Sequence, residues 1–400
     1  MRILFTTTGG TGHFHPLIPL AHAATAAGHE VACAASPSLR AAVEAVGLRF
    51  LPAGFDRRGI PFDDLFPATR SLTGPALGKF VSVEVRINTE ARQMAPDLLR
   101  IAGEWMPDLI VRESAEYGGC VAAEALGIPH ASVRSSYTTS SYGLRHVIGD
   151  ALTALRADYG LPADLDGDSP FRYLHLAFEP PGFWPADEPL APTYHLLRPV
   201  VFDRSGGEGL PSWVASLPPV PTVCATLGTF MNRSTAVFAA ILEGLRDEGM
   251  NLILAVGRDI DPVQFGPQPG NVHTERYIPL SLLLPQCDLV VHHAGFSTVV
   301  TTLLNGLPTV TIPLGADQPQ NARRCAALGV GEVIASDNRT PEAIREVVRR
   351  VFGEPSYRGK AERVRDEMAA LRGPEYAVQL LERLAKEKQP LLTASHSVRG

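Results

Sequence analysis

The sequence predicts an α/β protein made of two similar halves, each with a parallel sheet whose strands are joined by crossover helices. Short β-branched or apolar runs alternate with segments of helical periodicity from residue 1 to about 135, and the alternation restarts after residue 221. The 400 residues are enough for two or three domains. The 36 glycines and 34 prolines exceed average usage but stay below the level typical of disorder, so they indicate many turns between short elements.

In the first half, strand-like runs are bounded by turn residues, and several helical segments end at a glycine. The expected strands are 3–8, 30–35, 48–52, 108–112 and 130–134, and the expected helices are 15–27, 37–46, 78–103 and 116–127. Residues 53–77 are rich in Pro, Gly, Asp and Phe without a clear period, and such long loops are usually functional or mobile. Residues 136–192 are also irregular, with one helix expected from 142 to 159.

A stretch rich in Gly and Pro, residues 203–221, is the best linker in the chain. After it, the expected strands are 222–227, 251–256, 288–292, 308–312 and 331–335, and the expected helices are 234–248, 296–305, 318–328 and three amphipathic segments between 341 and 388. We therefore expect a first domain over 1–202, a linker over 203–221, a second domain over 222–374, a helix over 375–388 that returns to the first domain, and a tail over 389–400.

Charge and cysteine usage argue against several classes of protein. The 42 acidic and 36 basic residues give a net charge of −6, so the chain has no excess of positive charge to bind nucleic acid. The chain enters a strand directly after Met1-Arg2, without the pattern of a signal peptide, and no window resembles a membrane span, so we expect a cytoplasmic protein without stable membrane insertion. The five cysteines lack a CxxC pair and are expected to be buried free thiols; they are Cys33, Cys120, Cys224, Cys287 and Cys325.

The turn after the first strand, residues 9–16 (GGTGHFHP), places His13 where ligands of open α/β sheets bind. A dinucleotide site is disfavoured, because the GxGxxG spacing puts His15 at the third glycine and the second strand ends without an acidic residue for a ribose. His13 is instead a candidate general base, although an isolated histidine at such a turn is more often a capping or core residue.

A second strand-to-helix turn, residues 290–298 (VVHHAGFST), predicts an anion site, most simply for phosphate. The helix expected over 296–305 has no charged side chain, so nothing in its first turn neutralises the positive end of the helix dipole. The small Ala294 and Gly295 allow an anion to approach the backbone. A plain buried helix would explain the lack of charge but not the two histidines.

Two further turns are weaker signals. Asp317 and Gln318 follow the next strand and suit a ligand with many hydroxyl groups, although Asp317 alone can equally cap the following helix. Gly228 and Thr229 form another turn that can face a phosphate.

Together these features resemble the GT-B glycosyltransferases of family 1, in particular actinobacterial enzymes that glycosylate natural products. The resemblance covers essentially the whole chain, and its most specific part runs from 276–280 through 292–295 to 313–321. It implies two Rossmann-like domains that face each other across a cleft, with the acceptor on the N-terminal half and the nucleotide sugar on the C-terminal half.

The resemblance also implies that His13 is the catalytic base, which deprotonates the acceptor as it attacks the anomeric carbon and inverts its configuration. In the family an Asp further along the chain orients this histidine, and here the matching passage, 108–113 (DLIVRE), ends in Glu113. Glu113 would fix the tautomer and stabilise the imidazolium. Glu116 is close enough in the sequence to remain an alternative.

The donor residues are carried over from the family in the same way. The segment 277–279 matches the one that holds the nucleobase of the donor, and the turns at 228 and 293 match the pyrophosphate site. Residues 317–318 match the pair that binds sugar hydroxyls. The expected donor set is Gly12, Gly228, Thr229, Tyr277, Ile278, Pro279, His293, Gly295, Phe296, Ser297, Thr298, Asp317 and Gln318.

One departure from the family concerns the ribose. Many relatives that use UDP-sugars carry a Glu eight residues after the phosphate-binding histidine, and counting from His293 reaches Thr301. A buried carboxylate is useful only where both ribose hydroxyls satisfy it. The departure therefore favours a dTDP-sugar donor.

We expect an inverting, metal-independent hexosyltransferase that moves a deoxysugar from dTDP to a hydrophobic natural product and needs no further cofactor. The DxD-like strings at 166–168 and 259–261 lie in loops where Asp is common, so they do not indicate a metal. Aromatic side chains of the long loops fit a flat or apolar acceptor, although core packing accounts for them equally well; they are Phe55, Phe62, Phe66, Phe80, Tyr137 and Tyr142.

Two alternatives remain at this point, and a homodimer is compatible with each of them. One is a UDP-sugar transferase that acts on a lipid or cell-wall intermediate, suggested by residues 9–12 (GGTG), and the missing Glu weighs against it. The other is a catalytically silent GT-B protein that binds a nucleotide sugar. The presence of both His13 and Glu113 weighs against that alternative.

Overall fold

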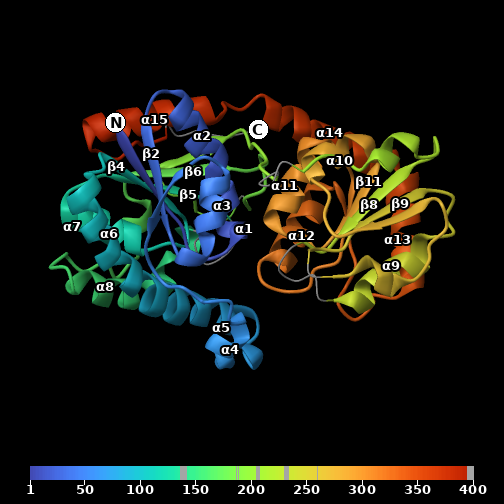
Figure 1. Cartoon of the computed structure of the whole chain (residues 1–400), viewed down its shortest axis with the longest axis horizontal. Coiled ribbons are helices and arrows are strands. Elements are labelled where there is room, and N and C mark those ends of the chain that lie inside the picture. The colour runs from blue at the N-terminus through green and yellow to red at the C-terminus, as the bar shows by residue number, and fades with distance from the viewer. Residues whose placement is uncertain are drawn as a thin grey trace. The chain divides into compact units, whose positions relative to one another are not determined.

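The computed structural model describes residues 1–135, 142–185, 187, 189–203, 208–228, 234–258 and 260–393. The chain divides into two compact units (Figure 1). The first comprises Met1–Phe178, Ala186–Ser205 and Leu371–Gly400, and the second comprises Glu179–Pro185 and Gly206–Ala370. Each unit is built around its own parallel sheet, which is the α/β architecture that the sequence predicts.

Seven parallel strands form the sheet of the first unit, in the order β3-β2-β1-β4-β5-β6-β7. Two of them are not among the predicted strands: β6 (Leu174–Phe178) lies within the segment expected to be irregular, and β7 (Tyr194–Leu197) follows that segment. They are short, each contains a histidine, and Asp-, Gly- and Pro-rich segments flank them, so no period of two stands out. The other five correspond to predicted strands: β1 (Arg2–Thr6), β2 (Glu30–Ala35), β3 (Arg49–Pro52), β4 (Leu109–Glu113) and β5 (His130–Val133).

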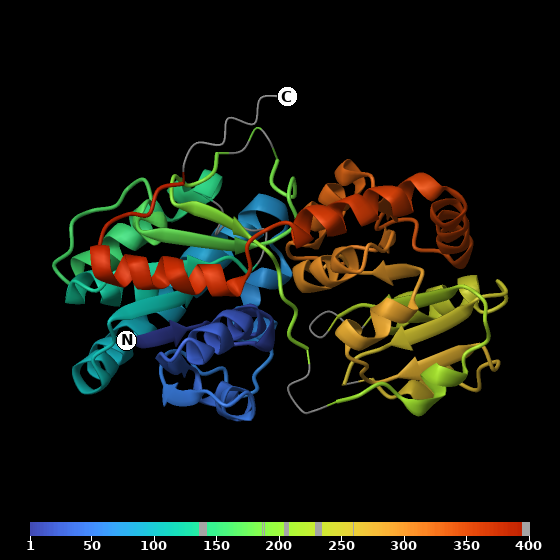
Figure 2. The same cartoon turned by 90° about the horizontal axis from the view of Figure 1, so that it is seen from above.

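Alternate residues of β1 point to opposite faces of this sheet. Ile3 and Phe5 pack with α2 (Ile18–Ala26), α3 (Arg40–Ala45) and α15 (Pro374–Glu387). Leu4 packs on the other face with α6 (Arg92–Trp105) and α7 (Gly118–Leu126). Figure 2 shows α15 alongside the first unit, to which this last helix belongs although it is far from α2 in the sequence.

Residues 53–105 contain more helical elements than the sequence predicts. The expected loop over 53–77 includes α4 (Phe62–Leu65), η3 (Pro67–Arg70) and the start of α5 (Gly74–Phe80). The single helix expected over 78–103 is instead α5, then η4 (Val81–Ala91), which is a π-helix, then α6. π-Helical turns are rare in proteins, and those that occur are often found at functional sites. The remaining helices of the unit are α1 (Thr11–Phe14), η1 (His15–Leu17), η2 (Pro37–Leu39), η5 (Tyr142–Ile148), α8 (Gly149–Ala157) and η6 (Ser169–Phe171).

Six parallel strands form the sheet of the second unit, in the order β10-β9-β8-β11-β12-β13. β10 (Val272–Glu275) is not predicted, because it is a short edge strand with three polar or charged side chains that pairs with β9 alone among the described strands. The others are β8 (Thr222–Thr226), β9 (Asn251–Ala255), β11 (Leu289–His292), β12 (Thr309–Thr311) and β13 (Gly331–Val333). The helices are η7 (Ser212–Ser216), α9 (Thr235–Leu245), η8 (Pro262–Phe265), α10 (Leu280–Leu283), η9 (Leu284–Gln286), α11 (Phe296–Leu304), α12 (Gln318–Leu328), α13 (Pro341–Gly353) and α14 (Pro355–Ala369).

Each sheet has a switch point, where the strand order reverses, between β1 and β4 in the first unit and between β8 and β11 in the second. Ligands of open α/β sheets bind beyond the carboxyl ends of the strands at such a point. His13 follows β1 and Glu113 ends β4, while Gly228 follows β8 and His293 follows β11. The fold therefore brings the predicted turns of each unit to the edge of the sheet where a ligand is expected.

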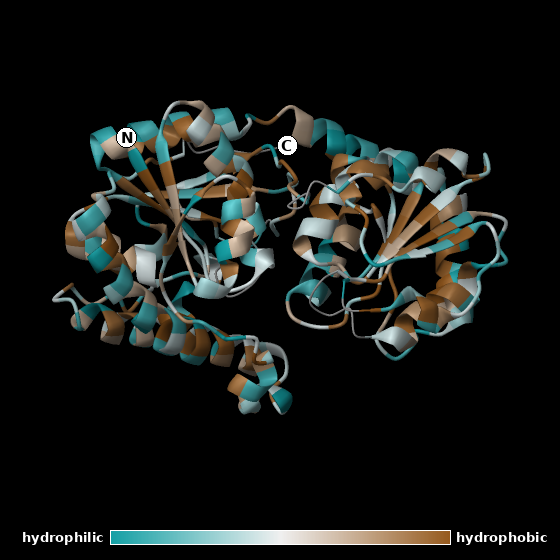
Figure 3. Cartoon of the chain, in the orientation of Figure 1, coloured by the Kyte–Doolittle hydropathy of each residue, from teal (hydrophilic) through white to brown (hydrophobic). Residues whose placement is uncertain are grey.

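The strands are the most apolar part of both units (Figure 3), and they form the centres of the two main cores. All five cysteines are buried free thiols, as predicted. Within the described ranges, no helix is both long enough and apolar enough to cross a membrane.

Candidate active site

His13 is held at the start of the first helix, directly after β1. Gly10 makes this turn with a φ of +118°, a conformation that only glycine adopts readily. The His13 side chain is 25% exposed, and its Nδ1 lies 3.2 Å from Oε2 of Glu113 at the end of β4. One ring nitrogen therefore faces a carboxylate, while part of the ring is accessible.

Glu113 is fully buried and remains ionised. Its Oε1 accepts hydrogen bonds from the Ala115 N–H (3.0 Å) and from the hydroxyls of Ser114 (3.1 Å) and Ser135. Burial alone would raise the pKa of Glu113, but His13, Ser135 and the Ala115 N–H together lower it to about 2. Oε2 lies 3.2 Å from Nδ1 of His13 without the alignment of a hydrogen bond, and it has no hydrogen-bond partner among the described residues.

Glu116, the alternative partner for His13, is directed elsewhere. It accepts hydrogen bonds from the Thr6 hydroxyl (2.5 Å) and from the Gly119 N–H (2.9 Å), and burial raises its pKa. Glu116 therefore ties β1 to the start of α7. The carboxylate that lies against His13 is that of Glu113.

The second ring nitrogen of His13 contacts a residue that the sequence analysis missed. Nη2 of Arg86, on the π-helix η4, lies 2.9 Å from Nε2 of His13. Arginine only donates hydrogen bonds, so Nε2 must accept, and the ring proton then sits on Nδ1, facing Glu113. Burial alone would lower the pKa of Arg86, but Glu90 and Glu113 raise it, so the guanidinium stays charged. In the sequence, Arg86 and Glu90 look like an ordinary i,i+4 pair on an exposed helix face, and nothing in their spacing indicates this site.

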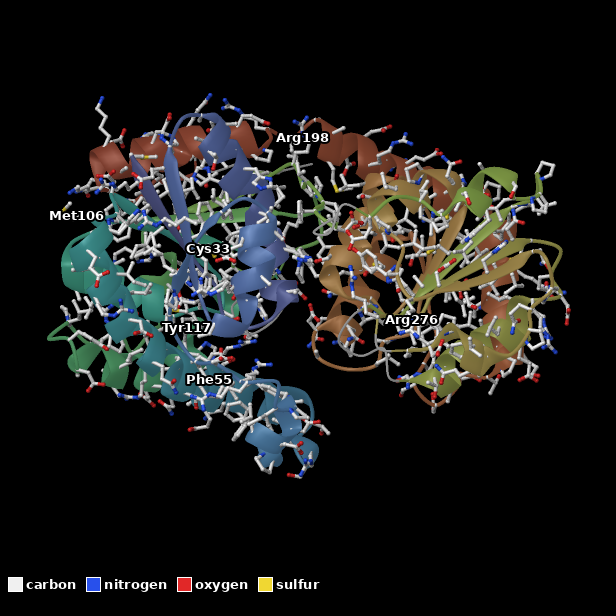
Figure 4. All side chains as sticks on the ribbon, in the orientation of Figure 1. Cys33, Phe55, Met106, Tyr117, Arg198 and Arg276 are labelled. Carbon is white, nitrogen blue, oxygen red and sulfur yellow. The ribbon has the colours of Figure 1, made fainter. Side chains whose placement is uncertain are left out.

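A pocket next to Arg86 opens at the carboxyl ends of β1, β2 and β3. Its wall combines the apolar Phe55, Met94 and Tyr117 with the polar Thr8 and Arg86. Figure 4 labels Phe55 and Tyr117 in the first unit. Burial raises the pKa of Tyr117 to about 12, so its phenol is neutral. The pocket is small, and it brings these side chains together beside Arg86.

The aromatic residues predicted to bind the acceptor fall into two groups. Phe55 and Phe62 pack on Phe66, with ring centroids 6.4 and 5.2 Å apart, and Phe80 ends the neighbouring α5 half-buried. Tyr142 does not join them, because it packs edge-on against Phe171 in a separate core cluster. Tyr137 lies outside the described residues.

In the second unit, the predicted anion site is the N-terminus of α11. Ala294 (φ +65°) and Gly295 carry the chain from β11 into this helix. No side chain of the described residues caps it, and its first turn has no acidic residue, so the positive end of the dipole is not neutralised. Thr298 in that turn is buried and Ser297 is exposed. The backbone N–H groups of this turn can therefore bind an anion.

The two histidines before α11 have different roles. His292 is fully buried and holds the turn, because its Nδ1 accepts the N–H of Ala294 (3.0 Å) and its Nε2 contacts the Thr309 hydroxyl (2.6 Å). Burial lowers the pKa of His293 to about 4, so this ring is neutral, and its Nδ1 has no hydrogen-bond partner among the described residues. The interpretation that both histidines serve an anion is therefore wrong for His292.

Gly228, after β8, makes room for His293. It has a φ of +74°, and a Cβ at this position would lie 2.6 Å from Cε1 of His293. A glycine is therefore needed where the two turns of the switch point meet. Thr229, predicted to belong to the same site, lies outside the described residues.

The loop after β12 is tied to the α11 turn. Nδ2 of Asn321 donates to the carbonyl of Ala294 (2.9 Å) and to Oδ2 of Asp317 (3.0 Å). Asp317 makes no capping hydrogen bond to α12, so the alternative role as an N-cap is not seen. Oε1 of Gln318 accepts the N–H groups of Leu314 (2.7 Å) and of the next residue (3.1 Å). The carbonyl end of Gln318 is thus used to shape the loop.

Comparison with known proteins decides the family. The model for the C-terminal domain of erythromycin biosynthesis protein CIII-like proteins matches residues 246–384, and the model for their N-terminal domain matches residues 22–153. The chain belongs to the EryCIII-like glycosyltransferases.

Relatives of this glycosyltransferase are sugar transferases of Streptomyces. The aklavinone 7-beta-L-rhodosaminyltransferase of Streptomyces galilaeus is 30% identical, over 97% of this chain and 96% of that protein. The L-demethylnoviosyl transferase of Streptomyces niveus is 31% identical, over 98% and 100%. The crystal structure of the glycosyltransferase VinC in complex with dTDP has a TM-score of 0.80 at 27% identity and covers 96% of this chain and 100% of that chain. The fold is GT-B, as the resemblance implied.

The remaining donor residues predicted for the glycosyltransferase lie in both units. Tyr277 packs against the guanidinium of Arg258, 4.2 Å from the ring centroid, and Ile278 is buried. Pro279 precedes α10. Gly12 lies in α1, in the first unit.

One cluster of this glycosyltransferase has the residue types of a metal site. Cys120, Glu124 and His130 place possible ligand atoms within 4.8 Å of one another. However, Glu124 already pairs with the guanidinium groups of Arg156 (2.6 Å) and Arg172 (2.7 Å). Two adjacent cations disfavour a bound metal ion, so the cluster is a buried ion-pair network.

Aspartates of the two DxD-like strings bind groups of the protein near them in the chain. Asp168 pairs with Nε of Arg145 (2.5 Å), and the Asp261 side chain accepts the N–H of Val263 (3.3 Å) at the start of η8. Asp259 lies outside the described residues.

Proposed function

We propose that the protein transfers a sugar from a dTDP-sugar to a hydroxyl group of a hydrophobic natural product, with inversion at the anomeric carbon, and that His13 is the general base. The observation that carries the proposal is the position of the His13 ring, with Nδ1 3.2 Å from Glu113 and Nε2 2.9 Å from Arg86. In this tautomer Nε2 presents a lone pair, which a general base requires.

In the proposed reaction, the acceptor hydroxyl gives its proton to Nε2 while its oxygen forms a bond to the anomeric carbon. The bond from that carbon to the diphosphate oxygen breaks, and the electron pair leaves with dTDP. Attack from the side opposite the leaving group inverts the configuration. Glu113 stabilises the imidazolium, because a carboxylate with a pKa of about 2 stays ionised at neutral pH.

The second unit supports binding of the diphosphate. The N-terminus of α11 has neither a capping side chain among the described residues nor an acidic residue in its first turn, and the neutral ring of His293 lies next to it. Backbone N–H groups and a histidine N–H can stabilise the charge that develops on the leaving dTDP. The proposed mechanism uses these groups and no divalent metal.

The choice of dTDP rests on Thr301 in the same helix. Thr301 is buried, and its hydroxyl donates a hydrogen bond to the Ser297 carbonyl (2.7 Å). The side chain is thus engaged within α11 and offers no carboxylate to a ribose. A 2′-deoxyribose leaves no hydroxyl that requires such a partner. The dTDP bound to VinC gives further support.

The substitution His13→Ala tests the base. We expect transfer from dTDP-glucose to 2-naphthol to fall by about 10²–10⁴-fold, while calorimetry shows an unchanged affinity for dTDP. A matched control is His22→Ala, because His22 lies on α2 outside the site, with its Nε2 on the carbonyl of Val46 (2.9 Å) and its ring against Phe202. Retained turnover would refute the base, and a product with retained anomeric configuration, measured by NMR, would refute the inverting mechanism.

A panel of nucleotides tests the donor separately. A ligand at about 100 times its Kd adds roughly 2.7 kcal/mol to the free energy of unfolding. We expect dTDP to raise the melting temperature more than UDP or GDP at equal concentration. A larger effect of UDP would contradict the role assigned to Thr301.

A further inference from the structure

The contact between Arg86 and His13 restricts the chemistry of the acceptor. To give up its proton, an acceptor hydroxyl has to lie within about 3 Å of Nε2 of His13. Nη2 of Arg86 is 2.9 Å from that same nitrogen. An acceptor oxygen that takes over the hydrogen bond to Nε2 therefore lies beside the guanidinium.

Arg86 is held in this position by a buried carboxylate. Its Nη1 donates to Oε2 of Glu90 at 2.6 Å, and the side chains of Arg86 and Glu90 are only 12% and 8% exposed. The other oxygen of Glu90 accepts a weaker hydrogen bond from Arg57 (3.4 Å). The guanidinium is thus fixed by its own ion pair, and an entering acceptor displaces it from Nε2 without releasing it from Glu90.

The charges around Nε2 favour an acidic acceptor. A cation beside the reacting oxygen stabilises the oxyanion that forms when the acceptor loses its proton. The other charged groups that face this point are the carboxylates of Glu113 and Glu90 and the guanidinium of Arg57. Glu116 is hydrogen-bonded to the end of β1, and its raised pKa favours the neutral form. Arg86 is therefore placed to stabilise the acceptor oxygen as it loses its proton.

We propose that Arg86 binds the reacting oxygen of the acceptor and thereby selects phenolic hydroxyl groups over aliphatic ones. Phenols ionise near pH 10, as tyrosine does, whereas aliphatic hydroxyls are far less acidic and need a stronger base. The aromatic side chains of Phe55 and Tyr117 lie around the same small pocket as Arg86. This inference rests on the proposed function, because it names the acceptor class of the same site.

Binding of 4-nitrophenol tests the inference without turnover, because the bound phenolate is seen directly by its visible absorbance. In the wild type with dTDP present, we expect the ionisation midpoint of the bound probe to lie at least one pH unit below that of the free probe, a tenfold preference for the phenolate. Arg86→Met should abolish this difference, and Arg86→Lys should keep part of it. The control is Arg92→Met, which removes a half-exposed arginine of the next helix that pairs with Asp158. A bound probe that titrates like the free one, or no binding at millimolar concentration, overturns the inference.

Turnover gives a second readout that a purely structural role would not produce. With dTDP-glucose as donor, we expect the wild type to prefer 2-naphthol to 2-naphthalenemethanol by at least tenfold in kcat/KM. Arg86→Met should lower kcat/KM at least tenfold more for the phenol than for the alcohol, because the lost cation stabilises mainly the more developed phenolate. An equal loss with both acceptors, or a wild type that prefers the alcohol, overturns the selection of phenols.

The two proposals fail in different ways. In His13→Ala, loss of turnover with retained binding of the nitrophenolate supports both roles. Retained turnover in that variant refutes the base but leaves the tenfold preference of Arg86 for a phenolate measurable. Unchanged acceptor selectivity in Arg86→Met refutes the inference and leaves the base intact.

Discussion

The substitution Glu113→Gln should lower kcat by about three to four orders of magnitude and leave the affinity for dTDP nearly unchanged. Gln has the size of Glu and can keep the hydrogen bonds to Ser114, Ala115 and Ser135 through its carbonyl oxygen. What it removes is the negative charge beside Nδ1 of His13. That charge matters most when the ring becomes an imidazolium during proton transfer.

The magnitude follows from the distance of 3.2 Å between Nδ1 and Oε2 of Glu113. Two unit charges at that separation interact with about 5 kcal/mol at an effective dielectric constant of about 20. Each 1.36 kcal/mol in the barrier corresponds to about tenfold in rate. The loss of the counter-charge therefore corresponds to roughly three to four orders of magnitude in kcat.

The assay is transfer from dTDP-glucose to 2-naphthol under single-turnover conditions, with dTDP affinity measured by calorimetry. Glu116→Gln is the matched control, since Glu116 is also buried but binds Thr6 and Gly119 instead of His13. We expect its kcat to stay within about tenfold of the wild type. A variant Glu113→Gln that retains a tenth of the wild-type kcat, or a Glu116→Gln that loses as much as Glu113→Gln, would refute the reasoning.

Three further predictions concern the donor site and stability. Gly228→Ala places an alanine at a φ of +74° with its Cβ 2.6 Å from the His293 ring, so we expect the free energy of unfolding to fall by about 1–2 kcal/mol. Calorimetry should also show weaker binding of dTDP. The control Gly270→Ala, where a Cβ meets open space, should change neither quantity. Thr301→Glu should shift the affinity ratio toward UDP, because the carboxylate gains ribose hydroxyls as partners, and an unchanged ratio would contradict the role of this position. The pKa of Glu113 falls from 4.5 to about 2 on folding, so the stabilisation that its ionised form gives the fold is present above pH 4.5 and is lost as the pH falls to about 2. Over this range the free energy of unfolding should drop by about 3 kcal/mol in the wild type and by less in Glu113→Gln.

Much of the fold could be predicted because parallel strands buried on both faces are short apolar runs. β2 and β8 are such runs, and the alternation of these runs with helical segments predicts the two parallel sheets. β10 could not be predicted, because it pairs on one side only and its His273 and Glu275 break the apolar pattern. Its place in the sheet depends on β9, which is not a property of its own residues.

The candidate site was partly predictable for the same reason. His13 and His293 follow strands that the apolar pattern identifies, and turns after strands are where ligands of such sheets bind. Arg86 could not be found, because an Arg and a Glu four residues apart usually form a solvent-exposed pair. Only the tertiary position of η4 turns this pair into a buried contact with the ring of His13.

The two contacts on the His13 ring have separable consequences. Because arginine cannot accept a hydrogen bond, Arg86 at Nε2 already requires the proton to be on Nδ1, whatever Glu113 does. Before an acceptor binds, Glu113 is therefore not the only group that sets the tautomer of the ring. Once an acceptor has displaced Arg86, Glu113 alone faces Nδ1, and its charge at 3.2 Å stabilises the imidazolium as it forms, so that charge determines the expected size of the loss in Glu113→Gln.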